Sequence, residues 1–145
     1  MLNSINEAFG LHKVDLRTYS PLALAFIGDS VFATVVKTVI IERGNCQGAK
    51  LHSYSAHLVR AESQAKMFDL WKEIITEEEG DILKRGRNAK SVNGTKYASE
   101  EDYRKATAVE ALTGYLFLAG CEERLCELIR LGIDAVLDAD NGKDA

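Results

Sequence analysis

Two long apolar segments dominate this chain, and each contains a single ionisable side chain. In residues 21–36, PLALAFIGDSVFATVV, that side chain is Asp29; in residues 106–121, ATAVEALTGYLFLAGC, it is Glu110. Segments this apolar form core helices, where an isolated carboxylate is unfavourable unless it is protonated, hydrogen-bonded or bound to a cation. We therefore expect the two helices to meet and the two buried carboxylates to share a divalent ion. Carboxylate ligands favour Mg²⁺ or Mn²⁺ over zinc.

Small residues lie close to both carboxylates. Gly28 precedes Asp29, Ala33 follows it by one helical turn, and Gly114 follows Glu110 by one turn. Neighbours one helical turn apart share a helix face. They could leave room for a metal, its waters and a phosphate. They could equally allow close helix packing, with the carboxylates hydrogen-bonded to the backbone. The residues alone leave both interpretations open.

Length and composition indicate a single domain over residues 1–145. The chain is 46% hydrophobic, which is enough for a sizeable core. Pro21 is its only proline, which gives little support to an all-β sandwich. The net charge of −4 argues weakly against a general nucleic-acid binder, although the local distribution of charge matters more.

Cysteine usage and the N-terminus indicate a cytoplasmic protein. The three cysteines form no C-x-x-C pair, so we expect neither a disulfide framework nor a zinc site; they are Cys46, Cys121 and Cys126. The N-terminus lacks the basic start and apolar stretch of a signal peptide. Asp29 and Lys37 interrupt the apolar run and argue against a membrane span.

Helix signals predict an all-α fold. Ser20-Pro21 and Ser99 are typical helix starts, and Thr76 to Glu79 forms a capping box. The expected helices are 21–43, 50–75 with a possible break at Arg60-Ala61, 76–85, 100–119 and 122–137. We expect an ordered core over about residues 15–138 and a frayed tail over 139–145.

A basic stretch covers the end of the third of these helices and the residues that follow it. Five cations occur there without an acid, in a chain that is acidic overall: Lys84, Arg85, Arg87, Lys90 and Lys96. Glycine, asparagine and serine recur from Arg85 to Ala98, which predicts a flexible loop suited to binding phosphates. The alternative is a solvated basic loop beside the acidic residues at 77–81 and 100–102.

Several motifs together resemble the ribonuclease III family. ALAFIGDSVF (23–32) resembles the signature segment of its endonuclease domains, and ATAVEALTGYLFLAG (106–120) resembles its second acidic motif. AESQAK (61–66) and LKRGRNAKS (83–91) are closer to the Mini-ribonuclease III branch. The resemblance covers about residues 15–130. The branch usually lacks a double-stranded-RNA-binding domain, and this chain ends without room for one.

The resemblance implies an all-α ribonuclease III endonuclease bundle that acts as a two-fold homodimer in the bacterial cytoplasm. It would cut double-stranded RNA with Mg²⁺, for which Mn²⁺ can substitute. Its expected role is maturation of the large-subunit (23S) ribosomal RNA precursor, where a ribosomal protein could assist. Asp29 and Glu110 match the family's acidic motifs and would be the catalytic metal ligands. The expected RNA-binding residues are Lys84, Arg85, Arg87, Asn88 and Lys90.

The chain also departs from the full ribonuclease III pattern. Where those domains carry further acids near the site, this chain has Leu22, Ala25 and Thr107, as the Mini branch does, and Ala33 replaces a larger acidic residue. Two alternatives to the nuclease follow. One is a non-catalytic RNA-binding dimer on a ribosome or processing complex, which would have little reason to keep both carboxylates. The other is a Mg²⁺-dependent nucleotide pyrophosphohydrolase, which would need a denser acidic cluster.

Overall fold

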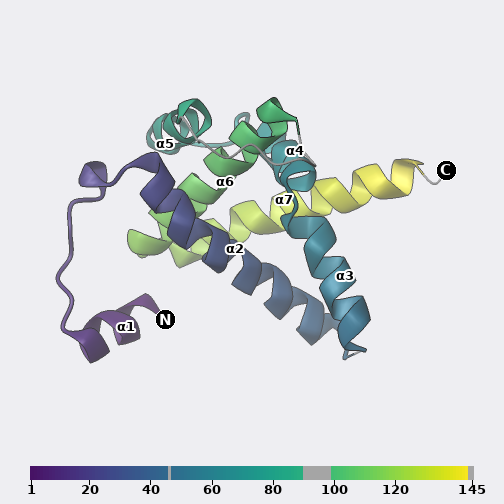
Figure 1. Cartoon of the computed structure of the whole chain (residues 1–145), viewed down its shortest axis with the longest axis horizontal. Coiled ribbons are helices and arrows are strands. Elements are labelled where there is room, and N and C mark those ends of the chain that lie inside the picture. The colour runs from purple at the N-terminus through teal and green to yellow at the C-terminus, as the bar shows by residue number, and fades with distance from the viewer. Residues whose placement is uncertain (46, 90–98, 144–145) are drawn as a thin grey trace.

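The computed structural model describes residues 1–45, 47–89 and 99–143, and these residues form helices and turns without a strand. The predicted all-α fold is confirmed. The α-helices, labelled in Figure 1, are α1 (Leu2–Phe9), α2 (Pro21–Arg43), α3 (Gly48–Val59), α4 (Ala61–Trp71), α5 (Glu77–Asn88), α6 (Glu100–Leu118) and α7 (Glu122–Lys143). A short 3-10 turn, Leu16–Thr18, precedes α2.

The three predicted helix starts are confirmed by their caps. The hydroxyl of Ser20 accepts a hydrogen bond from the Ala23 amide at 3.1 Å. Ser99 accepts one from the Asp102 amide at the same distance. At the start of α5, Thr76 and Glu79 exchange the two bonds of a capping box. Each cap satisfies amide groups that have no partner inside the helix.

The predicted break at Arg60 is also confirmed. Arg60 is extended, with φ −69° and ψ 155°, and separates α3 from α4. The buried Ser63 hydroxyl donates to the His57 carbonyl at 2.6 Å and holds the corner. The break lets α4 turn onto α6 while α3 follows the C-terminal half of α2 (Figure 1).

The ends of the chain differ from prediction. Helix α1 was not predicted; it buries none of its residues and stands at the edge of the molecule (Figure 1). The predicted frayed tail is wrong as far as Lys143, because α7 continues six residues beyond Leu137. His57 Nε2 lies 2.6 Å from Asp140 Oδ2, which fastens this extension to α3.

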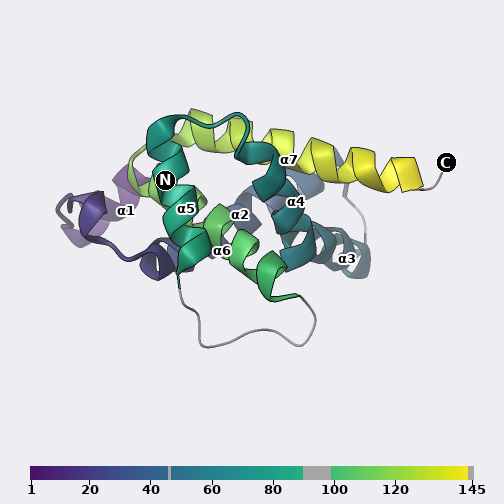
Figure 2. The same ribbon diagram turned by 90° about the horizontal axis from the view of Figure 1, so that it is seen from above.

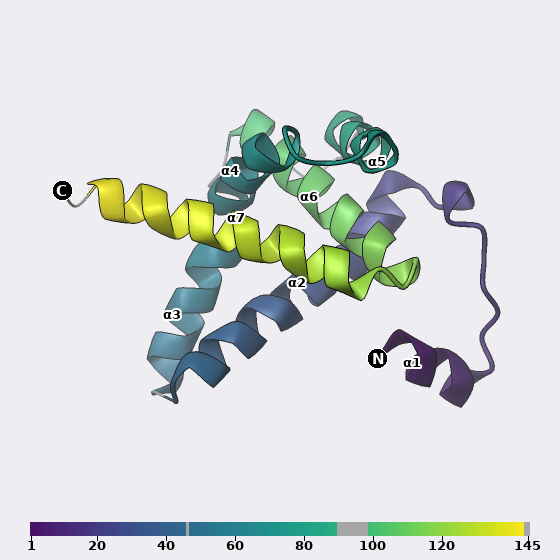
Figure 3. The same cartoon turned by 180° about the vertical axis from the view of Figure 1, so that it is seen from behind.

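The core surrounds α6. This helix packs most extensively on α2 and then on α5 and α4, between which it runs in Figure 2. The last helix, α7, crosses behind α2 and α6 in Figure 1 and in front of them in Figure 3. The fully buried Trp71 indole donates to the Leu128 carbonyl at 2.8 Å and joins α4 to α7. The core therefore fixes α6 on several sides.

By length and composition, α2 could cross a membrane, as many core helices could. Of its most apolar stretch, 33% is buried against the rest of the chain. Several large apolar side chains on α2 remain exposed, namely Leu22, Phe26 and Ile41. Its hydrophobicity thus exceeds what this single chain covers.

Candidate active site

Gly28 and Gly114 lie where α2 crosses α6. A Cβ atom added to Gly28 would lie 1.7 Å from the Glu110 carbonyl oxygen, and one added to Gly114 would lie 2.0 Å from that of Leu24. Real Cβ contacts are never this short, so the two backbones touch through the glycines. The expectation that the two helices meet is confirmed, and this close approach brings Asp29 beside Glu110.

The two carboxylates differ in burial. Glu110 is half-buried, but Asp29 is exposed, so the prediction that both are buried is wrong for Asp29. The reason is helical geometry, because Gly28 occupies the position on α2 that faces α6. Asp29, the next residue, therefore lies beside the contact and not inside it, on the stripe that also presents Leu22 and Phe26.

Electrostatics link the pair. Burial, and then the negative charge of Asp29, raise the pKa of Glu110 to about 8. The Gln64 amide opposes this increase in pKa by favouring the charged carboxylate. The Nε2 atom of Gln64 nevertheless makes no hydrogen bond of standard distance and angle among the described residues. Glu110 is thus a carboxylate whose ionisation is unfavourable without a compensating cation.

The surroundings of this pair fit one divalent cation. Among the described residues, neither Asp29 nor Glu110 forms an ion pair with a cationic side chain. A cation would relieve their mutual repulsion and supply the charge that Glu110 lacks. In the same part of the chain, no third His, Cys, Asp or Glu joins them. Ala25 and Thr107 are buried, and the Thr107 hydroxyl donates to the Tyr103 carbonyl.

The basic stretch begins as a helix. The prediction of a loop starting at Arg85 is wrong as far as Asn88, where α5 ends. Gly86 is buried against α6, and an added Cβ atom would lie 2.8 Å from Ala108 Cα. This glycine is a packing residue, and Arg85 and Arg87 project from a rigid last turn. Lys90 and Lys96 lie outside the described residues.

A surface hollow collects several of the predicted RNA-binding side chains. Lys84, Arg85 and Asn88 line it together with Arg17 and Tyr115. Its wall also includes acidic side chains, and the Tyr115 hydroxyl donates to one of them, Glu78, at 2.6 Å, which raises the tyrosine pKa to about 12.

Arg87 is turned toward α6 instead. Its Nη2 lies 3.8 Å from Glu101 Oε1. Arg87 therefore lies beside one of the acidic residues at 100–102, as the alternative of a solvated basic surface expects. Lys84 and Arg85 remain exposed.

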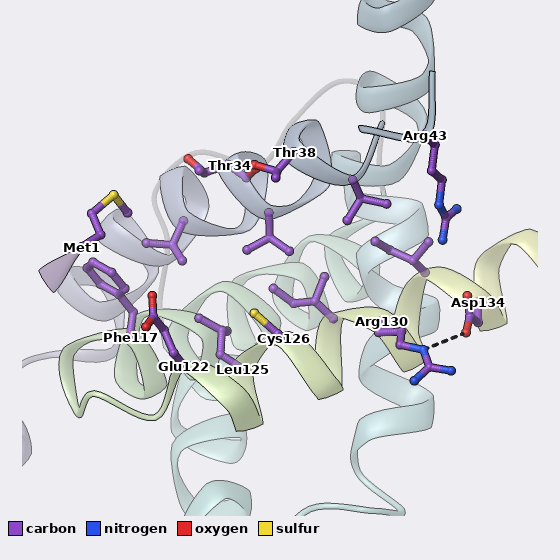
Figure 4. Close-up of a pocket in the computed structure, with 15 residues that line it drawn as sticks. Met1, Thr34, Thr38, Arg43, Phe117, Glu122, Leu125, Cys126, Arg130 and Asp134 are labelled. Carbon is purple, nitrogen blue, oxygen red and sulfur yellow. Dashed lines mark hydrogen bonds and ion pairs between the residues drawn. The ribbon is translucent and has the colours of Figure 1, made fainter. Parts of the chain in front are cut away.

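An apolar groove between α2 and α7 is separate from the carboxylates. It encloses about 480 Å³, and neither Asp29 nor Glu110 lines it. Figure 4 shows Met1 near one end and Arg43 at the other, with the Arg130–Asp134 ion pair nearby. The described lining offers no pair of neighbouring acids like the pair at the α2–α6 crossing.

Comparison with known proteins shows the family to which this chain belongs. The model of the ribonuclease III domain matches residues 22–120, which contain both carboxylates and the start of the basic stretch. The chain belongs to the ribonuclease III family. It is an endoribonuclease, and the family acts on double-stranded RNA.

Within the family, curated proteins similar to this chain include Mini-ribonuclease 3 enzymes. The one from Thermoanaerobacter sp. strain X514 is 40% identical over 94% of this chain and 96% of its own length. The one from Staphylococcus aureus is 42% identical over 79% of this chain and 87% of its own. A Fusobacterium nucleatum protein of known crystal structure superimposes with a TM-score of 0.77 at 28% identity, covering 83% of this chain and 98% of the other.

Proposed function

We propose that this endoribonuclease hydrolyses double-stranded RNA with Mg²⁺ held by Asp29 and Glu110. The observation that supports the proposal is the α2–α6 crossing, where backbone contacts through Gly28 and Gly114 bring two acids together without a cationic partner among the described residues. A packing role alone would not require a half-buried acid whose pKa is raised to about 8 beside a second acid.

Asp29 and Glu110 divide the work by their burial. Glu110 sits in the crossing and would hold the cation from the protein side, with few alternative conformations. Asp29 is exposed and would hold it from the side that the RNA approaches. When bound, Mg²⁺ supplies Lewis-acid activation of the phosphodiester. With two protein carboxylates, RNA phosphate oxygens are natural further ligands.

The RNA itself would be recognised by its backbone. The deep, narrow major groove of A-form RNA hides base edges from side chains, which leaves phosphates and 2′-hydroxyls as contacts. Lys84, Arg85 and Asn88 offer three phosphate donors from one helix end. We extend the proposal to Arg87 and Lys90, to a precursor of large-subunit ribosomal RNA as the substrate, to a cytoplasmic location and to assistance by a ribosomal protein.

The enzyme would act as a two-fold dimer. Phe26 is 82% exposed and Leu22 is 42% exposed, although both belong to α2, which packs extensively on the central helix α6. They share the outward stripe of α2 with Asp29. A second copy covering these side chains would lie next to the carboxylates, and each copy would then cut one strand of a duplex.

The test is cleavage of a labelled RNA duplex in Mg²⁺ or in EDTA. We expect Asp29→Asn and Glu110→Gln each to lower the rate at least about a thousandfold while both variants remain folded and still bind the duplex, because a neutral amide keeps the size but loses the charge. The matched control is Asp134→Asn, which neutralises an acid in the α2–α7 groove. Cleavage by either site variant at the wild-type rate would contradict the shared-cation proposal.

Two other outcomes would favour the alternative functions. If the wild type binds the duplex but does not cleave it in Mg²⁺ or in Mn²⁺, the protein is an RNA-binding module. Hydrolysis of nucleotides in preference to duplex RNA would indicate a small-molecule enzyme.

The dimer has its own test. Phe26→Asp should convert a dimer into a monomer by light scattering at micromolar concentration, because an exposed charge cannot be buried in an apolar interface. Phe9→Asp alters a residue on α1 that is 75% exposed and serves as the control. A wild-type monomer would contradict the two-strand arrangement.

A further inference from the structure

The Gln64 side chain in α4 is unusual among the buried groups. It is 1% exposed, and its Nε2 atom is the one buried side-chain nitrogen or oxygen that has no hydrogen-bond partner in the described part of the chain. An amide donor without a partner in a protein interior is unfavourable. A methionine or leucine would fill the same space without that cost, so packing does not explain a glutamine here.

The packing of α4 on α6 shows what this amide faces. Near the end of α4, Asp69 Oδ1 contacts Lys105 Nζ of α6 at 2.9 Å. Gln64 lies five residues before Asp69 on α4, and Glu110 lies five residues after Lys105 on α6. Contacts that progress in opposite directions along two packed helices are those of an antiparallel pair. The Gln64 amide acts on the Glu110 carboxylate at this α4–α6 contact.

The preceding residue of α4 provides an internal contrast. Ser63 is also 1% exposed, but its hydroxyl is satisfied, because it donates to the His57 carbonyl at 2.6 Å. Two adjacent buried polar side chains therefore have different tasks. Ser63 fixes the corner between α3 and α4, whereas Gln64 is directed at the candidate active site.

We propose that Gln64 is a positioning residue for Glu110: its amide donates to one carboxylate oxygen and thereby turns the other oxygen toward Asp29 and the divalent cation. This inference rests on the function proposed above. A donor behind a metal-binding carboxylate restricts its rotation and keeps the ligand oxygen in place. The arrangement also gives the buried amide the partner that it lacks without the cation.

Binding of Mn²⁺ alone, measured by calorimetry without RNA, tests the proposal. Gln64→Met keeps the length of the side chain but removes the donor, and we expect it to weaken Mn²⁺ binding about 10- to 100-fold. Ser63→Ala is the matched control, because it should lower the unfolding temperature and leave Mn²⁺ binding unchanged. In a Glu110→Gln background, Gln64→Met should cause no further loss, since the two residues act as one unit.

Kinetics give a second measurement. At saturating Mg²⁺, Gln64→Met should lower kcat on duplex RNA and leave KM for the RNA unchanged, because the amide contacts Glu110 and not the substrate. A change in KM with an unchanged kcat would contradict a positioning role.

A third measurement needs no substitution at Gln64. In the wild-type protein, the side-chain NH₂ resonances of Gln64 should shift when Mg²⁺ is added, and Glu110→Gln should abolish that shift. If Gln64→Met fails to fold, these resonances decide the question, and resonances insensitive to both changes would overturn the inference. Equal Mn²⁺ affinity of wild type and Gln64→Met would overturn it too. A wild type that binds no Mn²⁺ would instead contradict the proposed function itself.

Discussion

The α2–α6 crossing and the end of α5 carry the two parts of the proposed activity, and they are built differently. At the crossing, the backbones of two helices touch through Gly28 and Gly114. That contact places the short side chains of Asp29 and Glu110 near each other. At the end of α5, long cationic side chains such as Arg85 project into solvent from one helical turn.

This difference separates two kinds of precision. Holding a cation requires ligand atoms within fractions of an ångström, which a rigid, glycine-mediated backbone contact can supply. Neutralising phosphates requires positive charge within a broad surface, and mobile lysine and arginine side chains suffice. We therefore expect the crossing to respond sharply to single atoms and the end of α5 to respond gradually to charge.

The largest effect should come from one methyl group at the crossing. Gly28→Ala places a Cβ atom 1.7 Å from the Glu110 carbonyl oxygen, which neither backbone can avoid without separating α2 from α6. We expect a loss of roughly 4 kcal/mol or more of unfolding free energy, which is exceptional for a single substitution. Cleavage should be lost with it. Denaturant unfolding and the duplex assay measure the two losses.

Gly80→Ala is the control for that substitution. The nearest atom to its added Cβ is Ile75 Cδ1 at 3.9 Å, so the site in α5 has room. Alanine inside a helix should stabilise the protein by roughly 0.5–1 kcal/mol relative to glycine. If Gly28→Ala were as well tolerated as Gly80→Ala, the backbone contact at the crossing would not exist in solution.

A smaller effect should appear as a pH dependence of the metal-free protein. The pKa of Glu110 is 4.5 ordinarily and about 8 in the folded chain. The stability that this group contributes is therefore fully present below pH 4.5 and is lost as the pH rises to 8. Glu110→Gln is neutral throughout, so it should be more stable than wild type at pH 8, by on the order of a few kcal/mol, with the difference declining toward acid pH. Thermal unfolding in EDTA measures this difference.

Glu79→Gln should give the opposite sign. Hydrogen bonds from Arg124 are the largest cause of the lowered pKa of Glu79, with the two side chains 2.9 Å apart. This carboxylate stabilises the folded state above its unfolded pKa and loses that contribution as the pH falls through the folded pKa. The variant should be less stable than wild type at neutral pH and approach it in acid. Equal pH profiles of the two variants would contradict the assigned environments.

The sequence predicted the crossing better than the rest of the molecule. Two apolar runs with one acid each are a pattern of residue types, and the caps at Ser20 and Ser99 bounded their helices. The exposure of Asp29 was not predictable from these runs. It depends on Gly28 facing α6, and an apolar run has no polar face to show its orientation.

Other features lay outside what local patterns contain. Gly86 resembled a loop residue, but the contact that keeps it helical comes from α6, distant in sequence. Gln64 stood in a recognisable motif, yet its burial against α6 depends on the turn at Arg60. The extension of α7 was missed because its tail is polar and is held through Asp140 by a residue of α3.

The smallest and most gradual effect should occur at the end of α5. Replacing Arg85, Arg87 and Lys90 with alanine should weaken duplex binding for every sequence tested and lower the salt dependence by about one unit of slope per lost contact. Affinity measured against salt on two unrelated duplexes tests this, with Arg130→Ala in α7 as the control. An unchanged slope, or a loss confined to one duplex, would leave these cations as solvated surface.

The single variants refine this prediction, because the two arginines are not equivalent. Arg85 is exposed, whereas Arg87 lies 3.8 Å from Glu101 and must give up that interaction to reach a phosphate. A cation that stays near an acid neutralises an RNA phosphate less fully, and fewer counterions then leave the RNA. Arg87→Ala should therefore lower the salt slope less than Arg85→Ala does. Glu101→Gln should then strengthen duplex binding slightly, and only when Arg87 is present. Equal slopes for the two arginine variants would mean that the Arg87–Glu101 pair is too weak in solution to affect RNA binding, as most exposed ion pairs are.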